Sequence, residues 1–421
     1  MRREQIVVVV GQGYVGLPVA MRAVEVGFKV VGIDLDISRI DRLKAGESYV
    51  EDIPESVLRS ALDSGMYLPT ASYDDVTNFD IAIITVPTPL RDSLPDLTFI
   101  ESSGVSLASH LKVGATVVLE STTYPGTTQE LLVPILEEGS GLAAGRDFFV
   151  GYSPERIDPG NKTWGFVETP KVVSGINMES LAKVKGFYDA LVETTVPVSS
   201  PKEAELTKLL ENTFRHVNIA LVNELAIFAN QLGVNVWESI EAASTKPFGF
   251  MKFTPGPGVG GHCLPVDPSY LSWQVRRQLG QNFRFVELAN DINDHMPDYV
   301  IQRLIAILNR DSKALRGSRV LLVGLAYKKN TGDFREAPSR KIIDLLVGLG
   351  AEVSAIDSHI EPQMWPQNVI SVGSDLVAVS GFDAIVLLTD HDDLDVGVFG
   401  GITTPILDTQ CVMSGPNVEV L

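Results

Sequence analysis

The sequence feature that most constrains the fold is GQGYVG at residues 11–16. It follows residues 6–10, Ile-Val-Val-Val-Val, which have the pattern of a strand buried on both faces. It precedes LPVAMRAVEVG, which predicts a helix that ends at Gly27. A G-x-G-x-x-G turn between a strand and a helix is typical of the first unit of a dinucleotide-binding fold.

The three glycines of this turn have separate physical roles. Gly11 would make the tight turn, Gly13 would let a pyrophosphate approach the backbone, and Gly16 would allow close packing of the helix, whose N-terminus receives the phosphates. A second predicted strand, residues 29–33, ends at Asp34, 18 residues beyond Gly16. Because an acid there accepts hydrogen bonds from the ribose hydroxyls, the sequence predicts NAD rather than NADP as the cofactor.

Further apolar runs at residues 81–86, 116–119 and 148–151 alternate with helical stretches and predict a parallel, doubly wound sheet. Functional side chains of such sheets gather where the strands end. Thr88, Thr122 and Glu155 lie at such ends, although residues of these types also serve there as helix caps.

The last part of the chain repeats this organisation. SRVLLVGLAYKKNTGD (318–333) parallels the first strand and turn, GAEVSAID (350–357) parallels GFKVVGID (27–34), and GFDAIVLLTD (381–390) parallels NFDIAIITVP (78–87). The copy keeps Gly324 but has Tyr327, Lys328 and Lys329 where the later glycines would stand. Lysines there suit a phosphate held by charge, so we predict a second, modified nucleotide site.

A long helix is predicted between the two units, over residues 200–233. Ser200 and Glu203 form a capping box, and Gly233 stops the helix. About 32 residues at ~1.5 Å each span on the order of 48 Å, enough to link two domains and to carry a dimer contact. The helix has an apolar stripe, consisting of Leu206, Leu209, Leu210, Phe214, Val217, Leu221 and Leu225. Lys208 and Asn212 share one face, either as functional groups or as solvated surface residues.

The stretch PGPGVGGHCLPVDP, residues 255–268, presents Cys263 in a loop of glycines and prolines. Such a loop lets the backbone approach a ligand closely and fixes its own shape, which favours a nucleophilic thiol over a cysteine buried as a small hydrophobe. Asp267 follows four residues on.

Composition limits the partners and the compartment. A net charge of −19 argues against nucleic acid or an anionic membrane as the main partner, so an anionic ligand would need a few local cations. The two cysteines, Cys263 and Cys411, are far apart and histidines are not clustered, so neither a metal site nor a disulfide framework is predicted. No apolar window approaches ~18 residues, which predicts no membrane span and, by default, a cytoplasmic protein.

NAD together with a nucleophilic cysteine suggests oxidation of an alcohol beyond the aldehyde. Thiolate attack on the aldehyde gives a thiohemiacetal, a second hydride transfer gives a thioester, and water releases a carboxylate. Lys208 and Asn212 are suited to stabilise the oxyanion. A carboxylate must activate the water, and Asp267 and Glu155 are the candidates.

At this point the sequence resembles the UDP-glucose/GDP-mannose dehydrogenase family of nucleotide-sugar 6-dehydrogenases over essentially its full length. The resemblance rests on GQGYVG, VPTP, ESTT, SPER, Lys208 with Asn212, GVGGHCLPVD and GLAYKKNTGDFREAP. It implies an α/β chain of two Rossmann-like doubly wound domains joined by a long central helix. The expected domains are an NAD-binding domain at 1–200, a central dimerisation domain with the cysteine loop at 201–312 and a nucleotide-sugar domain at 313–421.

The resemblance also implies roles for single residues. The catalytic set would be Cys263 as nucleophile, Lys208 and Asn212 for the oxyanion, Asp267 and Thr122 for proton and water, and Glu155 as a candidate base for thioester hydrolysis. The expected cofactor-binding residues are Gly11, Gly13, Tyr14, Val15, Gly16, Asp34, Arg39, Thr88, Thr122 and Arg335. The expected substrate-binding residues are Glu155, Arg156, Lys208, Asn212, Lys246, Phe253, Gly260, Tyr327 and Lys328, with Lys246 near where some relatives extend a basic residue into a neighbouring subunit.

Three positions depart from the pattern of the glucose enzymes. Pro159 replaces a second glutamate, Val266 replaces a lysine, and Gln410 replaces a late arginine. The motif wording is closer to relatives that act on UDP-N-acetylhexosamines, while UDP-glucose and dTDP-glucose stay open as substrates of this uronic-acid-forming reaction in polysaccharide or glycoside synthesis. The alternatives are a two-electron dehydrogenase, in which Cys263 is dispensable, and a sensor of NAD or nucleotide sugar without turnover.

Overall fold

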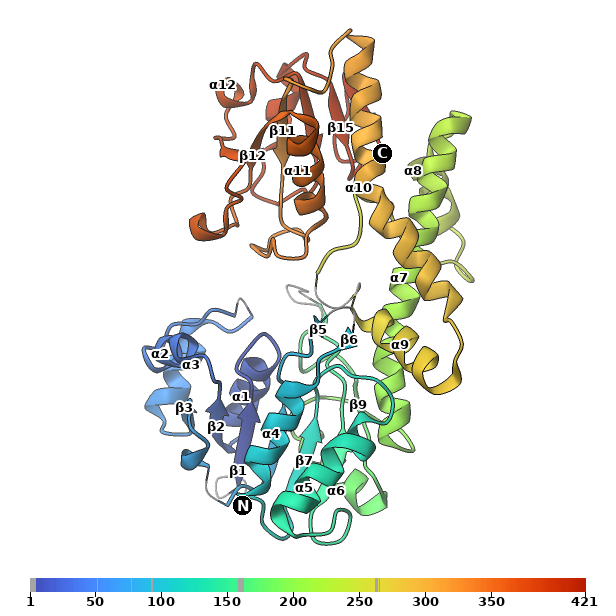
Figure 1. The fold of residues 1–421 in the computed structure, drawn as a ribbon. Helices are drawn as coiled ribbons and strands as arrows, with labels where there is room; N and C mark the ends of the chain where they lie inside the picture. The colour runs from blue at the N-terminus through green and yellow to red at the C-terminus, as the bar shows by residue number, and fades with distance from the viewer. Residues whose placement is uncertain are drawn as a thin grey trace. The chain divides into compact units, whose positions relative to one another are not determined.

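The computed structural model describes residues 5–50, 52–76, 78–91, 94–157, 163–261, 264 and 266–421. The chain divides into two compact units, Met1–Glu211 and Asn212–Leu421, and the boundary falls within helix α7 (Pro201–Leu232). Each unit is built around one six-stranded sheet (Figure 1). The division into three domains, with boundaries at residues 200 and 312, stays a prediction.

The sheet of the first unit has the strand order expected for a dinucleotide-binding fold. Its strands, in spatial order, are β3 (Tyr67–Thr70), β2 (Lys29–Ile33), β1 (Ile6–Val10), β4 (Ile81–Ile84), β7 (Thr116–Leu119) and β8 (Phe149–Tyr152). All neighbours pair in parallel, and the order corresponds to 3-2-1-4-5-6. The predicted doubly wound sheet is therefore confirmed, and the strand ends differ from prediction by at most two residues.

The helical segments of the first unit are α1 (Gly16–Glu25), α2 (Ile37–Lys44), α3 (Glu55–Asp63), the 3-10 helix η2 (Tyr73–Asp75), α4 (Thr98–Ala108), the π-helix η3 (Thr128–Leu132), α5 (Val133–Ser140) and α6 (Met178–Tyr188). Two further strand pairs are β5 (Leu90–Arg91) with β6 (Leu94–Pro95), antiparallel, and β9 (Lys171–Val173) with β10 (Thr195–Pro197), parallel.

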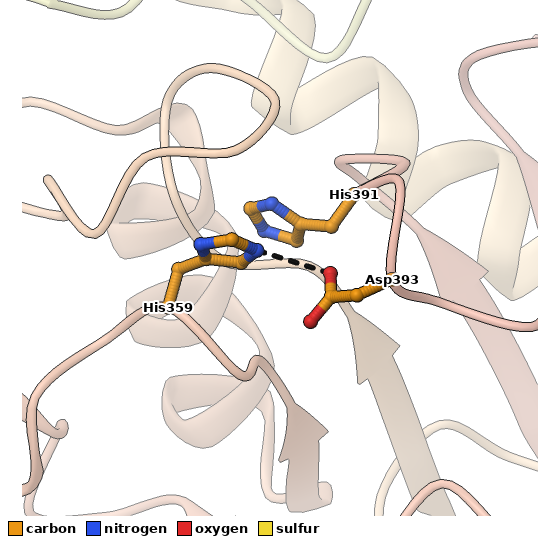
Figure 2. A group of neighbouring side chains, drawn as sticks. All are labelled: His359, His391 and Asp393. Atoms are coloured by element: carbon orange, nitrogen blue, oxygen red, sulfur yellow. Dashed lines mark hydrogen bonds and ion pairs between the residues drawn. The ribbon is translucent and has the colours of Figure 1, made fainter. Parts of the chain in front are cut away.

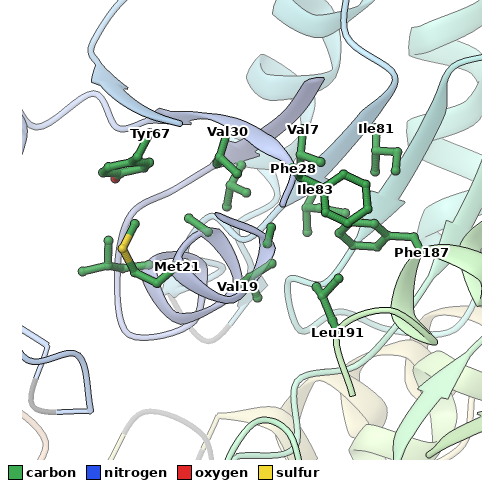
Figure 3. Close-up of a cluster of buried hydrophobic side chains, with 14 of the residues drawn as sticks. Val7, Val19, Met21, Phe28, Val30, Tyr67, Ile81, Ile83, Phe187 and Leu191 are labelled. Atoms are coloured by element: carbon green, nitrogen blue, oxygen red, sulfur yellow. The ribbon is translucent and has the colours of Figure 1, made fainter. Parts of the chain in front are cut away.

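The two faces of this sheet are covered by different helices because strand side chains alternate between faces. Val7 and Val9 pack with α1, α3 and α6, where the rings of Phe28 and Phe187 lie 5.6 Å apart (Figure 3). Val8 belongs to the opposite face and packs with α4 and α5. Each fully buried aliphatic or aromatic side chain stabilises the unit by roughly 1.5–3 kcal/mol, which is why the strands can be apolar throughout.

The second unit repeats the strand order of the first. Its strands, in spatial order, are β13 (Ile370–Ser371), β12 (Glu352–Ile356), β11 (Arg319–Val323), β14 (Ala384–Leu387), β15 (Ile406–Asp408) and β16 (Val418–Val420), all parallel. The remaining helical segments are α8 (Val236–Ser244), α9 (Asp267–Leu279), α10 (Arg284–Arg310), α11 (Pro338–Leu349), η4 (Pro362–Met364), α12 (Leu376–Val379) and η5 (Val396–Gly401). Helices α10 and α11 cover one face of the sheet, and the buried Phe399 of η5 lies on the other. The repeat predicted from the sequence is confirmed.

Helix α7 begins and ends where its sequence signals lie. Ser200 accepts a hydrogen bond from the backbone N–H of Lys202 at 3.2 Å and donates its hydroxyl to Glu203, and Gly233 follows the helix at φ +68°. Part of the apolar surface of α7 is not covered within one chain. The exposed apolar residues are Leu206, Leu210, Phe214, Leu221, Leu225, Phe228 and Leu232. None of the helices formed by the described residues combines the length and apolar content that crossing a membrane requires.

Candidate active site

The glycine-rich turn has the geometry that its sequence predicts. Gly11 has φ +91°, and a Cβ on it would lie 2.7 Å from the carbonyl oxygen of Thr85. A Cβ on Gly16 would lie 1.8 Å from the carbonyl oxygen of Gly11, so the start of α1 packs against the turn as only glycine permits. A Cβ on Gly13 would meet nothing within 4 Å. Gly11 and Gly16 are thus required by the protein's own packing, whereas Gly13 leaves backbone open to a ligand.

The surroundings of the turn fit a bound NAD. Helix α1 begins at Gly16 with no acidic residue in its first turn and no side-chain cap, so its amide groups are suited to a pyrophosphate. Asp34, at the end of β2, accepts a hydrogen bond from Gln12 N at 2.9 Å and lies 3.4 Å from Arg39 Nη1. Tyr14 is exposed and Val15 is half-buried.

Two tyrosines that the sequence analysis missed hold this turn. Tyr49 donates its hydroxyl to Gln12 O at 2.5 Å, and Tyr67 donates to Gln12 Oε1 at 2.7 Å. Burial raises the pKa of both phenols, so they act as donors near neutral pH. Neither tyrosine belongs to a sequence motif, because only the fold brings residues so far along the chain close to Gln12.

Of the predicted site residues in the first unit, Lys208 lies next to Glu155, which follows β8. Lys208 of α7 donates its Nζ to the carbonyl oxygen of Glu155 at 2.8 Å. The Oε1 atom of Glu155 accepts hydrogen bonds from the backbone N–H groups of Arg156 and Ile157, each at 2.7 Å. Spacing along α7 alone did not decide between a functional and a solvated Lys208; the structure places its ammonium on a main-chain carbonyl, and its catalytic role stays a prediction.

Two neighbouring predictions have other partners in this chain. The Arg156 guanidinium donates to Pro170 O at 2.7 Å and pairs with Glu211 at 2.7 Å. Thr88 donates its hydroxyl to the carbonyl oxygen of Thr122 at 2.8 Å, which ties the VPTP and ESTT segments together.

Two charged residues beside Glu155 were missed. Lys171 of β9 lies 2.9 Å from Glu155 Oε2 and 3.3 Å from Glu120 Oε1. Glu120 stands within the quoted ESTT segment, but Lys171 belongs to no motif, so its role is visible only in the fold.

In the second unit, Asn212 and Asp267 are brought together. Asn212 Nδ2 donates to Asp267 Oδ2 at 2.5 Å, and both residues are buried. Asp267 is the first residue of α9, so the pair fixes the end of the cysteine loop against α7. Cys263 itself lies outside the described residues, as does Pro159.

The loop glycines pack closely against the start of the second nucleotide-binding unit. A Cβ on Gly260 would lie 2.7 Å from Tyr327 Cβ, and one on Gly261 would lie 2.8 Å from the Tyr327 ring. Gly258 has φ +139° and packs near Pro338. The described glycines therefore let the loop approach the β11–α11 turn of the protein, and their approach to a ligand stays a prediction.

A cavity of about 550 Å³ opens beside this loop within the second unit. It contains three of the predicted substrate-binding residues, Phe253, Tyr327 and Lys328, together with Gln410. Its lining, in full, is Arg215, Ile219, Lys252–Gly258, Ala326–Lys329, Pro338, Ser339, Leu388–Asp390 and Gln410. The cavity thus combines aromatic surface with several cations, which suits a nucleotide with phosphates.

Arg215 and Lys252 are cavity residues that the sequence analysis missed. Arg215 lies three residues beyond Asn212 and seven beyond Lys208, so helical spacing places it on the same face of α7, a signal that was available. Lys246, by contrast, is not among the lining residues, and its ammonium lies 5.1 Å from the centre of the Phe248 ring. Arg335 pairs with Asp333 at 2.9 Å.

The second unit closes the position that corresponds to Asp34. Its counterpart, Asp357, accepts hydrogen bonds from Leu325 N at 2.7 Å and from His391 Nε2 at 3.1 Å, and its side chain is fully buried. Burial alone would raise the pKa of Asp357, but the His391 and backbone hydrogen bonds lower it to about 2. A carboxylate so enclosed is not offered to a ribose, so the second unit does not repeat the NAD site.

His359, His391 and Asp393 lie close together (Figure 2), and His391 contacts Asp357. The two imidazole rings stack at 4.4 Å, and His359 Nε2 lies 3.0 Å from Asp393 Oδ1. Both ring nitrogens of His391 already have partners, since Asn330 N donates to its Nδ1 at 2.9 Å. The cluster therefore serves to enclose Asp357, and a metal ion would have to displace these bonds.

Comparison with known families agrees with the two nucleotide sites. A sequence model of the UDP-glucose/GDP-mannose dehydrogenase family, NAD binding domain, matches residues 5–192. The central-domain model of the same family matches residues 202–295, and its UDP binding domain model matches residues 321–418. The protein is therefore an NAD-dependent nucleotide-sugar dehydrogenase, an oxidoreductase.

Individual relatives cover nearly the whole chain. A UDP-N-acetyl-D-glucosamine 6-dehydrogenase of Pseudomonas aeruginosa is 38% identical over 393 residues, which are 92% of this chain and 90% of the relative. A UDP-N-acetyl-D-mannosamine dehydrogenase of Methanococcus maripaludis is 34% identical over 390 residues, 91% of this chain and 86% of the relative. The solved UDP-D-ManNAc dehydrogenase of Pyrococcus horikoshii has a TM-score of 0.89 at 32% identity and covers 99% of both chains. The chain belongs to the UDP-glucose/GDP-mannose dehydrogenase family.

Proposed function

We propose that the protein oxidises the 6-hydroxyl of a UDP-N-acetylhexosamine to a carboxylate in two NAD-dependent steps. The relatives in the preceding comparison act, by their names, on UDP-N-acetylglucosamine and UDP-N-acetylmannosamine. The observation that carries the proposal is the hydrogen bond of 2.8 Å from Lys208 Nζ to the main-chain carbonyl of Glu155, which places the proposed oxyanion donor beside the residue that supplies the proposed base. The net reaction converts one alcohol, two NAD⁺ and one water into a carboxylate, two NADH and protons.

The first unit would hold the cofactor and the second the substrate's nucleotide. Bound NAD would supply the hydride acceptor, and the Gly11–Gly16 turn would hold its pyrophosphate. Arg215, Lys252 and Lys328 supply positive charge for a diphosphate in a protein whose net charge is −19. Phe253 and Tyr327 supply aromatic surface for the base.

The chain's own residues would carry the chemistry in sequence. Asp267 and Thr122 would manage the proton of the 6-hydroxyl and the water. The Cys263 thiolate would add to the aldehyde carbon, and loss of the second hydride would leave a thioester. Lys208 and Asn212 would stabilise the oxyanion at both stages, because the charge develops on the same oxygen.

Glu155 would be the base in the hydrolysis of the thioester. Burial alone would raise the pKa of the Glu155 carboxyl, but Lys171 and the surrounding donors lower it. The carboxylate is therefore ionised and able to accept a proton from water near neutral pH. Asp267 is the other candidate for this base; it accepts a hydrogen bond from Asn212 and is assigned above to the proton of the 6-hydroxyl.

The exposed apolar face of α7 supports a homodimer. Leu221 and Leu225 on this face are 53% and 46% exposed, and an apolar surface of this kind marks a protein contact. In such a dimer we also expect Lys246 of the neighbouring subunit to reach the active site, the role that the resemblance implies.

A panel of UDP-, dTDP- and GDP-sugars scored by NADH formation tests the proposal. We expect two NADH per UDP-N-acetylhexosamine and a uronic acid product, with net oxidation lost in Cys263→Ala. One NADH per sugar with a stable aldehyde would support a two-electron dehydrogenase, and binding without NADH formation would support a sensor. Activity confined to UDP-glucose or dTDP-glucose would overturn the choice of sugar while leaving the chemistry intact.

A further inference from the structure

A buried cluster of charged groups surrounds the carboxylate of Glu155. Lys171, the first residue of β9, places its Nζ 2.9 Å from Glu155 Oε2 and 3.3 Å from Glu120 Oε1. The side chain of Lys171 is 4% exposed and that of Glu120 is fully buried. Tyr188 donates its hydroxyl to Glu120. One ammonium group is thus shared by two carboxyl groups that come from two different strand ends.

The cluster holds one more carboxyl group than Lys171 alone needs as a partner. A buried ammonium requires an anionic partner, because an unpaired buried ion costs several kcal/mol, but Glu155 alone would meet that need. Among the described residues, Glu120 Oε2 has no hydrogen-bond partner. A second carboxyl group, buried at a cost and incompletely bonded, calls for a purpose beyond pairing with Lys171.

The surroundings shift the pKa values of the two carboxyl groups in opposite directions. Burial raises the pKa of Glu120, and Lys171 offsets only part of this effect. For Glu155 burial acts in the same direction, but Lys171, the Ile157 amide and Lys208 together lower its pKa. Two carboxyl groups whose pKa values are separated in this way are typical of paired roles in proton transfer.

We propose that Lys171 and Glu120 are positioning residues for Glu155: Lys171 aims its carboxylate, and Glu120 keeps Lys171 paired while Glu155 carries a proton. The inference rests on the proposed role of Glu155 as the base of thioester hydrolysis. In that step an O–H bond of water breaks and its proton goes to Glu155. The water oxygen bonds to the acyl carbon, and the Cys263 sulfur leaves with its electron pair. Lys171 would then face a neutral Glu155, and Glu120 Oε1, 3.3 Å away, supplies the negative charge.

Lys171→Met separates this role from a purely structural one. Its first-turnover burst of NADH should keep an amplitude of two per active site, because both hydride transfers precede hydrolysis. The acid limb of the steady-state kcat–pH profile should move up by about one to three pH units, because an opposite charge is removed from Glu155. Lys208, Arg156, Tyr188 and Glu120, which also face Glu155, stay in place. Lys202→Met, which breaks an exposed ion pair with Glu130 at 2.6 Å, should leave burst and profile unchanged.

Glu120→Gln tests the second half of the proposal. The glutamine amide keeps an oxygen acceptor for Lys171 and Tyr188 but cannot carry a negative charge. Steady-state turnover should therefore fall by about tenfold, as expected for residues of one interacting network, while the first-turnover burst of NADH keeps its amplitude. The double variant with Lys171→Met should be no slower than Lys171→Met alone, because Glu120 acts only through Lys171.

An unshifted acid limb in a folded Lys171→Met variant, or additive losses in the double variant, would overturn the proposal. If the thermal melt shows that Lys171→Met does not fold, Glu120→Gln and Tyr188→Phe test the proposal by the same burst and turnover measurements. Unchanged turnover in both variants would overturn the proposal. Glu155→Gln distinguishes failure of the proposed function: a wild-type hydrolysis rate there means that Glu155 is not the base, whatever Lys171 does.

Discussion

Gly16→Ala tests the central claim about the glycine-rich turn. An alanine Cβ there would lie 1.8 Å from Gly11 O and 2.5 Å from Thr85 Oγ1. The first contact is with backbone, which cannot rotate away, so α1 must move relative to β1. Gly13→Ala is the matched control in the same turn, because its Cβ would meet nothing within 4 Å.

The magnitude follows from overpacking. Forcing a methyl group into a packed site costs about 1–3 kcal/mol. The higher helix propensity of alanine offsets at most about 1 kcal/mol of this cost, so we expect the substitution to destabilise the unit. For a unit of this size each kcal/mol lowers the melting temperature by about 2–4 °C, so a net cost of up to about 3 kcal/mol predicts a loss of up to about 12 °C for Gly16→Ala.

Thermal melts without NAD, followed by NAD titration, separate the two effects. We expect Gly16→Ala to lower the melting temperature of the cofactor-free protein and to weaken NAD binding. Gly13→Ala should leave the cofactor-free melt unchanged and weaken NAD binding alone, because its methyl group intrudes only on the ligand. An unchanged cofactor-free melt in Gly16→Ala, or a large loss in Gly13→Ala, would refute the division of roles between the glycines.

Three further predictions concern the second unit and α7. The pKa of Asp357 is lowered from 3.8 to about 2, so the ionised carboxylate stabilises the fold above pH 3.8 by about 2 kcal/mol. This contribution is lost as the pH falls toward 2. The free energy of unfolding in urea should therefore decrease over this pH range in the wild type and not in Asp357→Asn. Leu225→Glu should raise the dimer dissociation constant by about tenfold or more in sedimentation experiments, whereas Leu35→Glu, also exposed, should not. Arg215→Met should raise the KM for the nucleotide sugar by about tenfold or more at unchanged KM for NAD, with Lys202→Met as the neutral control; equal effects on both substrates would contradict its place in the cavity.

Much of the fold was predictable because its signals are local. The strand β1, the turn at Gly11–Gly16 and the stop of α7 at Gly233 each depend on neighbouring residues, whose conformational limits act whatever surrounds them. The internal repeat was also predictable, since matching segments of the two halves contain the same apolar runs in the same order.

The candidate site was predictable only where residues share an element. Arg215 could have been found from its spacing to Lys208 and Asn212 on α7, since helical geometry alone places them on one face. The Asn212–Asp267 hydrogen bond joins residues 55 apart, and no pattern in the sequence specifies that separation.

The sequence by itself determined the NAD-binding turn and the α/β class, and it predicts a cysteine-based oxidation, because glycine conformations and chemically distinctive side chains carry this information at short range. Only the tertiary structure decided that Lys171 is shared between Glu120 and Glu155, and that His391 encloses Asp357. The physical reason is that buried charges need partners, and the partners that reach them are set by which strand ends lie together in the sheet.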